Sequence, residues 1–134
     1  MIRIAICCGE GFASGFLSRH LAESTVKEHL QEQVSFIFIP YFQLYERQDE
    51  ADIAMLMPHI EPMAKEDKKE YHIPLYIIPF KVVIMPPAAD YLSDAEYILE
   101  ETGGKGGLFY FPGEEKTAFV NRIGSRRKWE AAHK

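Results

Sequence analysis

The sequence predicts an α/β fold with three layers, in which helices cover both faces of a four-stranded parallel sheet. Two observations support this fold. Short apolar runs rich in β-branched or aromatic residues alternate with charged segments that have helical spacing. The 134 residues are also 47% hydrophobic and 26% charged, which is typical of one globular domain with its own core. Elements that alternate in this way favour right-handed crossovers between parallel strands.

Four apolar runs are the expected strands. The first, residues 2–7, ends at a pair of adjacent cysteines, and the second, residues 34–39, ends before a proline. Residues 52–57 and 74–78 are the third and fourth. Runs of this length that are bounded by proline or charge are typical of strands buried in a parallel sheet.

Three segments have the spacing of helices. Residues 14–30 begin at Ser14, a candidate N-cap, and residues 60–71 are rich in Lys and Glu. Residues 88–102 stop at two consecutive glycines, which favour the end of a helix.

Residues 103–134 are interpreted as a C-terminal extension of a single domain that spans residues 1–134. Within the extension, residues 108–111 could add an edge strand, and the tail from residue 116 could form a final helix. Before it, residues 82–85 could extend the fourth strand or form a separate one.

Charge and the N-terminal sequence exclude several classes of function. The formal net charge of −5 gives no broad attraction to nucleic acid or to an anionic membrane. No signal-peptide pattern and no run of 18 apolar residues is visible, so a cytoplasmic protein is expected. The two cysteines are neighbours, which disfavours a disulfide and favours reduced thiols.

The junction after the first strand carries most of the functional information. Gly9, Gly11 and Gly15 permit close backbone approach, and a helix that begins near Ser14 adds the positive end of a dipole. Ligands of parallel sheets collect beyond the carboxyl ends of the strands, so this loop is a candidate oxyanion site. Such a site lowers the pKa of a nearby thiol, and a nucleophilic thiolate results.

The spacing selects one of the two thiols. Cys8 stands ahead of the turn at Gly11 and the helix start at Ser14, whereas Cys7 is expected to be the last residue of the strand. Cys8 is therefore the candidate nucleophile. The alternative is that both cysteines are small, buried core residues.

The residues from Cys8 to Gly15 follow the order of a known signature. It consists of a first strand, a cysteine, two small residues, a glycine, a Met-like residue, and small or hydroxyl residues that open a helix. In this order the sequence resembles the lactose/cellobiose-type enzyme IIB components of the bacterial sugar phosphotransferase system. Residues 51–60 are similar to the third strand of that family and its Gly-Pro-Gln-Ile-like turn. The resemblance covers roughly residues 1–78.

The resemblance implies a Rossmann-like fold of the IIB type and a cytoplasmic phosphocarrier. Cys8 would accept a phosphoryl group from a histidine of an enzyme IIA partner and pass it to a sugar at a membrane enzyme IIC. Backbone N–H groups of the loop would hold the phosphate without a metal or another cofactor. The loop comprises Gly9, Glu10, Gly11, Phe12, Ala13, Ser14 and Gly15.

Glu10 departs from the family pattern, because it adds a carboxylate to a phosphate loop. Unless its side chain points to solvent, it should repel a phosphoryl group. A non-catalytic regulatory or binding module on the same fold is therefore the first alternative. A cysteine-based phosphatase is the second, but such enzymes place an arginine six positions after the cysteine, where this chain has Ser14.

One further residue is a candidate for the site. His59 follows the third strand and should lie on the same rim as Cys8, where it could contact a phosphoryl group or a partner. A histidine with a purely structural role in the turn is the alternative. The histidines lack the spacing of metal ligands, so no metal site is expected. Aromatic residues between positions 36 and 45 are interpreted as packing in the core and at its rim.

Overall fold

The computed structural model describes residues 1–7, 12–78, 88–111, 114 and 125–132. For residues 12–18, 128 and 129 it describes the backbone alone. Residues 82–85, where an additional strand was considered, lie outside these ranges, as do most residues between 112 and 124.

The fold is built on one parallel sheet. The described residues form five strands in the order β2-β1-β3-β4-β5, so the four expected strands are joined by the expected edge strand. Each strand lies within one residue of its expected start, and none ends later than expected. The strands are β1 (Ile2–Cys7), β2 (Val34–Phe38), β3 (Ile53–Leu56), β4 (Pro74–Ile77) and β5 (Gly107–Phe109).

Helices connect the strands and cover the sheet. The described helices are α1 (Phe12–Lys27), α2 (Tyr41–Arg47), α3 (Glu61–Glu66), α4 (Ala88–Thr102) and α5 (Arg126–Ala132), with short 3-10 turns η1 (Gln48–Glu50) and η2 (Pro58–Ile60). The chain passes from β1 outward to β2 and then back across β1 to β3. With right-handed connections, this reversal puts α1 on one face and α2, followed by α3, on the other.

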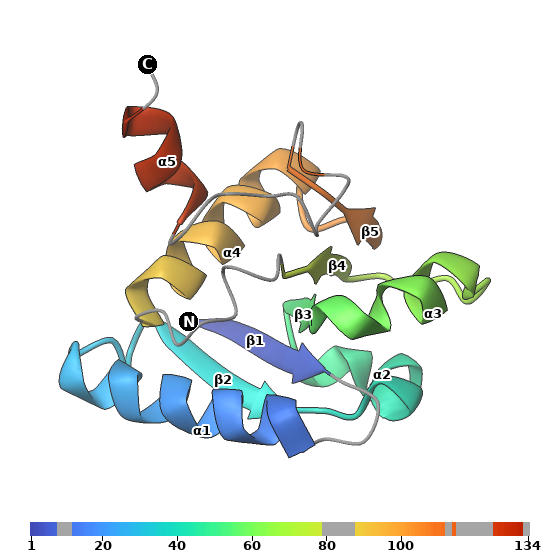
Figure 1. Cartoon of the computed structure of the whole chain (residues 1–134), viewed down its shortest axis with the longest axis horizontal. Helices are drawn as coiled ribbons and strands as arrows, with labels where there is room; N and C mark the ends of the chain where they lie inside the picture. Colours follow the sequence, from blue (N-terminus) through green and yellow to red (C-terminus); the bar gives the residue numbers. More distant parts are fainter. Residues whose placement is uncertain (8–11, 79–87, 112–113, 115–124, 133–134) are drawn as a thin grey trace.

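Helix α4 lies on the same face as α1 and packs against both α1 and β1. The backbone N–H of Ala88, the first residue of α4, donates to Ser24 Oγ and to Glu28 Oε2, both at 3.0 Å. The start of α4 therefore lies beside the end of α1 (Figure 1). Since β5 lies beyond β4, the connection through α4 has the opposite hand to the expected right-handed crossover.

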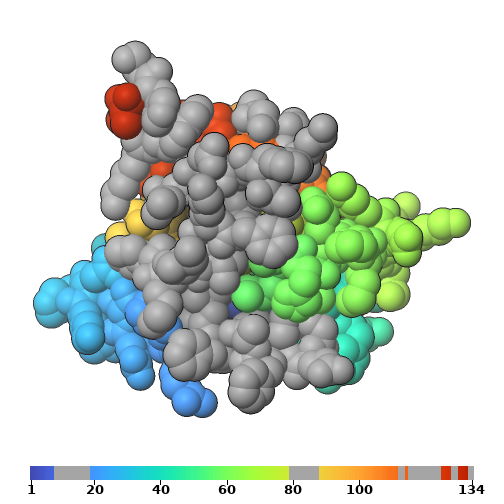
Figure 2. Space-filling view, viewed as in Figure 1, coloured from blue at the N-terminus to red at the C-terminus, as the bar shows by residue number. Residues whose placement is uncertain are grey.

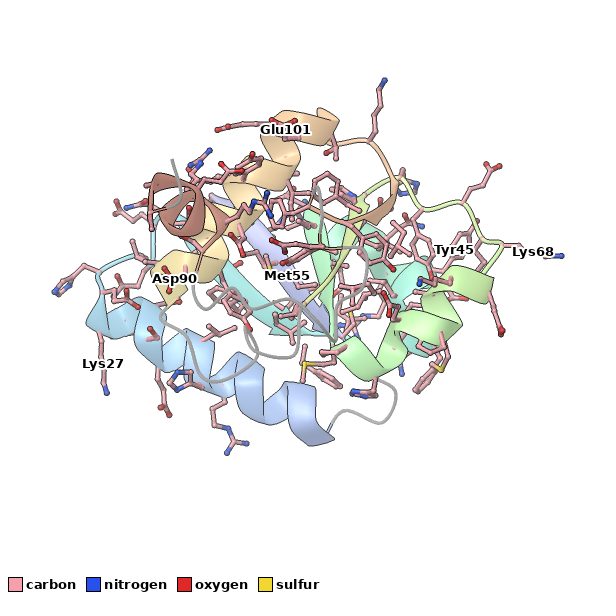
Figure 3. All side chains as sticks on the ribbon, turned by 45° about the horizontal axis from the view of Figure 1, so that its top comes forward. Lys27, Tyr45, Met55, Lys68, Asp90 and Glu101 are labelled. Atoms are coloured by element: carbon pink, nitrogen blue, oxygen red, sulfur yellow. The ribbon has the colours of Figure 1, made fainter. Side chains whose placement is uncertain are left out.

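The core extends over both faces of the central strands. All residues of β3 and β4 are buried, and so are the last four residues of β1. Strands buried on both faces need apolar side chains at every position, which explains why they are continuous apolar runs in the sequence. Met55 lies in the middle of the sheet, whereas Lys27, Lys68 and Glu101 point outward (Figure 3).

Three helix predictions need correction. Helix α1 begins at Phe12 and ends at Lys27, so Ser14 is not its N-cap but lies in its first turn. Its end is set by His29, which adopts a left-handed φ of 58°, and by the N–H of Leu30, which donates to the Thr25 carbonyl at 2.9 Å.

Helix α3 ends at Glu66, although residues up to 71 were expected to be helical. The backbone becomes extended at Asp67, and the Asp67 carboxylate accepts a hydrogen bond from the N–H of Lys69 at 2.9 Å. Such local side-chain bonds compete with continuation of a helix. Helix α2 was not expected, since it is short and follows Pro40 without a side-chain cap. Helix α4 has the predicted bounds, and Gly103 and Gly104 after it have positive φ.

The described parts of the extension pack against the sheet. Phe111 is completely buried. Its ring packs edge-to-face against the rings of Tyr76, Tyr97 and Phe109, with 5.2–5.4 Å between ring centres. Gly106 lies very close to the loop that precedes β4. A Cβ on residue 106 would be 1.6 Å from the Tyr71 carbonyl oxygen. Only glycine fits this approach.

Candidate functional site

The carboxyl ends of β1 and β3 meet at one edge of the sheet. Cys7, the last residue of β1, pairs with Leu56, the last residue of β3. The Cys7 carbonyl accepts a hydrogen bond from the Met57 N–H at 2.9 Å, and the Ile6 carbonyl accepts one from the Ile39 N–H at 3.1 Å. The chain leaves β1 and β3 toward opposite faces, so this is the point where ligands bind in open α/β sheets.

The structure assigns Cys7 to the core. It is the final residue of β1, as expected, and its exposed fraction is 0%. Cys8 and the following three residues of the predicted phosphate loop, Gly9, Glu10 and Gly11, lie outside the described residues. The Cys7 thiol is therefore not accessible to a reagent or partner at the surface.

The remaining loop residues form the first turn of α1. Helix α1 starts at Phe12, and the backbone of Ala13, Ser14 and Gly15 is helical. The first four N–H groups of a helix have no acceptor within it, and the helix dipole places positive charge there. This first turn contains no acidic residue. The end of β1 and the start of α1 lie at the same edge of the molecule (Figure 1).

His59 lies at this edge, on the turn directly after β3. Its neighbours Pro58 and Ile60 are buried, whereas His59 is exposed. The Ile60 N–H donates to the Met57 carbonyl at 2.9 Å, which closes the turn. The structure therefore brings His59 to the end of β3, where the sequence predicted it, with its side chain accessible to solvent.

Two exposed apolar side chains follow the same edge. Phe42 is 68% exposed on α2, which begins just after β2, and Met63 is 46% exposed on α3. Phe42 was expected to pack in the core or at its rim, and its exposure could not be derived from the aromatic pattern alone. In the space-filling view, the surfaces of α1 and α3 emerge on opposite sides of one face (Figure 2).

Tyr41, the first residue of α2, is buried and has a strong polar contact. Its hydroxyl donates to Asp67 Oδ2 at 2.7 Å, and the Tyr71 hydroxyl donates to the same oxygen at 3.1 Å. Burial and the hydrogen bond to Asp67 raise the pKa of Tyr41, and burial is the main reason that the pKa of Tyr71 rises to about 12. Both hydroxyls thus remain protonated donors at neutral pH.

A shallow cavity of about 450 Å³ lies elsewhere. Its lining includes Leu75, Gly107 and Leu108, and Gly107 pairs with Pro74, the first residue of β4. The cavity is therefore at the amino ends of the strands, opposite the edge where Cys7 ends β1.

Neither a metal centre nor a membrane span is found in the part of the chain that the structure describes. Those residues include no group of three or more metal-ligating side chains that could hold an ion. None of their helices is long and apolar enough to cross a membrane.

Comparison with known proteins identifies the family of this chain. No curated protein and no solved structure gives a significant match. Residues 3–94, more than half of the chain, match the model of the family described as the lactose/cellobiose-specific IIB subunit of the phosphotransferase system. The match includes β1 from its second residue, the candidate loop, the turn with His59 and the first half of α4. The chain therefore belongs to the lactose/cellobiose-specific IIB subunit family of the sugar phosphotransferase system.

Proposed function

We propose that this protein is a cytoplasmic phosphocarrier that takes a phosphoryl group onto Cys8. The donor is a phosphohistidine of an enzyme IIA, and the acceptor is a sugar at a membrane enzyme IIC. The observation that carries the proposal is that β1 ends at the buried Cys7, at the edge where β1 meets β3 and where ligands bind in such sheets. Cys8 is the next residue in the sequence.

The chemistry of the step needs few protein groups. The Cys8 thiolate attacks phosphorus, the S–P bond forms as the P–N bond to the donor imidazole breaks, and that imidazole leaves with the bonding electron pair. Oriented backbone N–H groups can stabilise the phosphoryl oxygens. The first turn of α1, from Phe12 to Gly15, supplies such groups four residues after Cys8.

The partner surface follows from the same geometry. A donor histidine can reach Cys8 only if the donor protein covers the edge around the end of β1. Phe42, His59 and Met63 are exposed near this edge, and a partner could bury the two apolar side chains. Burying large exposed apolar side chains is a common source of binding energy between proteins.

Phosphorylation on Cys8 is tested by mass spectrometry. The protein is incubated with phosphoenolpyruvate and the phosphotransferase components, including an enzyme IIA of the lactose/cellobiose type. We expect a phosphate mass increment that Cys8→Ala abolishes and Cys7→Ala leaves in place. Circular dichroism of both variants shows whether they fold, since Cys7 is buried.

The regulatory or binding module is the alternative that the same experiment decides. Glu10 in the loop favours it, because a carboxylate repels a phosphoryl group. A folded wild-type protein that gains no phosphate from any IIA partner would contradict the carrier and favour the module.

A further inference from the structure

The chain beyond the family match reaches the turn that carries His59. Tyr110, which follows β5, donates a hydrogen bond from its hydroxyl to Glu61 Oε2 at 2.6 Å. Lys65 is 3.7 Å from the same carboxylate and holds its ammonium 5.7 Å from the centre of the Tyr110 ring. Glu61 is the first residue of α3, two positions after His59. Figure 1 shows β5 beside α3 at this side of the molecule.

Residues 57–61, which we name the rim turn, are held at both ends. At the first end, the Met57 N–H donates to the Cys7 carbonyl at 2.9 Å. In the middle, the Glu61 N–H donates to the Pro58 carbonyl, and the buried Pro58 anchors the turn. At the second end, the Glu61 carboxylate accepts the hydrogen bond from the Tyr110 hydroxyl and pairs with Lys65 on α3. β1 thus contacts one end of the turn, and the extension contacts the other.

The contact at the second end is suited to a positioning role. A hydrogen bond to an ionised carboxylate is stronger than one between neutral groups. The Glu61 side chain is 19% exposed, so water competes only weakly with Tyr110. Burial and the hydrogen bond to Glu61 raise the pKa of Tyr110, so its hydroxyl stays a donor at physiological pH.

We propose that Tyr110 is a positioning residue, which holds the rim turn and with it His59 in the geometry needed for phosphoryl transfer at Cys8. The inference rests on the proposed carrier function. It gives a part of the extension a role in the site, because Tyr110 lies outside the residues that match the family. Positioning matters for transfer because small displacements of groups around a reacting centre reduce rates strongly.

The test uses two Tyr→Phe variants that each lose one hydrogen bond to a glutamate. Tyr110→Phe removes the bond to Glu61, and Tyr97→Phe removes the matched 3.0 Å bond to Glu130, which is on α5. Single-turnover phosphorylation by the IIA donor is followed over a range of donor concentrations. We expect the rate constant at saturating donor to fall about fivefold in Tyr110→Phe, as for the loss of one hydrogen bond, with the half-saturating concentration unchanged. Tyr97→Phe should match the wild type.

Substitution of Glu61 tests the other partner of the contact. Glu61→Ala should slow transfer as Tyr110→Phe does, whereas Glu61→Gln keeps an acceptor oxygen and should recover most of the rate. Combining Tyr110→Phe with Glu61→Ala should slow transfer no further than either change alone. Equal rates in Tyr110→Phe and Tyr97→Phe, or multiplicative effects in the double variant, would overturn the positioning role.

The NMR signals of the His59 ring test the positioning without phosphoryl transfer. They should shift or broaden in Tyr110→Phe and stay unchanged in Tyr97→Phe. A wild type that accepts no phosphate would overturn the carrier function, and the His59 signals would then test only whether Tyr110 holds the rim turn. Unchanged His59 signals in Tyr110→Phe would overturn the positioning role.

Discussion

The two adjacent cysteines show how strand register separates the roles of neighbouring residues. Cys7 belongs to β1, pairs with Leu56 and is completely buried. Buried cysteines of this kind behave as small apolar residues. Because the thiol of Cys7 is buried, Cys8 stays the predicted nucleophile at this edge.

His29 allows a test of a single backbone conformation. It has φ of 58° just after α1, a conformation that glycine adopts without strain and other residues adopt at a cost. We expect His29→Gly to raise the free energy of unfolding by about 0.5–1 kcal/mol, measured by urea denaturation. His20→Gly, the same change inside α1, should lower it by about 1 kcal/mol. A loss of stability in both variants would contradict the assigned turn.

At the scale of the elements, α2 and α3 are held together by polar contacts that involve few residues. The carboxylate of Asp67, after α3, accepts hydrogen bonds from Tyr41 on α2 and from Tyr71. Tyr71 also packs edge-to-face against Tyr45 on α2, with 5.6 Å between ring centres. Both helices are short, and short helices depend on tertiary contacts because they are marginal alone.

The Asp67 contacts should make stability depend on pH. Burial alone would raise the pKa of Asp67, but hydrogen bonds from Tyr41, the Lys69 N–H and Tyr71 lower it below its ordinary value. The stabilisation is thus complete above the unfolded-state pKa of about 4 and is lost as the pH falls through the folded-state pKa. Asp67→Asn should cost more at pH 7 than at pH 3, by less than about 1 kcal/mol because the carboxylate is partly exposed.

Chemical denaturation at both pH values measures this difference. Glu66→Gln is a suitable control, since Glu66 is the exposed neighbour of Asp67. An equal cost of Asp67→Asn at the two pH values would mean that the carboxylate does not carry the contact between α2 and the segment after α3.

For the whole molecule, the described parts of the extension add the edge strand β5 and the helix α5 to the fold. β5 pairs with β4 and covers its edge, and α5 packs on α4. The connection from β4 to β5 has the opposite hand to the usual right-handed crossover. The reason is that α4 packs on the same face of the sheet as α1, where it contacts β1 and β4.

A buried arginine joins α5 to the rest of the molecule. Arg126 is 7% exposed, pairs with the buried Glu114, and donates its backbone N–H to Asp94 at 2.7 Å.

Removing the Arg126 side chain should destabilise the attachment of the extension. Arg126→Ala removes one side of a buried ion pair with Glu114, and such changes cost about 3–5 kcal/mol. The matched control is Arg127→Ala, because Arg127 pairs with Glu100 at the surface, with side-chain exposures of 44% and 69%. That change should cost less than about 1 kcal/mol. Urea denaturation and limited proteolysis of the C-terminal segment measure both, and similar costs would contradict a buried pair.

Much of the fold could be predicted because its signals are local. The strands are apolar runs buried on both faces, and α4 has a clear apolar spacing and ends at two glycines with positive φ. Helix α2 was missed because seven residues after a proline carry little pattern, although Tyr41 and Leu44 share its buried face. Helix α3 ends early where the Asp67 carboxylate accepts a hydrogen bond from the Lys69 N–H. The helical spacing of apolar residues does not reveal such a contact.

The sequence by itself determined the family and the α/β class, because these depend on order and spacing along the chain. The choice of Cys8 as nucleophile rests on the same spacing and stays a prediction. Tertiary structure decided which residues from distant segments meet. The pairing of β1 with β3 brings His59 to the edge where β1 ends, and the pairing of β4 with β5 brings Tyr110 to Glu61. These contacts join residues 33 or more positions apart, and no local pattern encodes them because they form only when the sheet is complete.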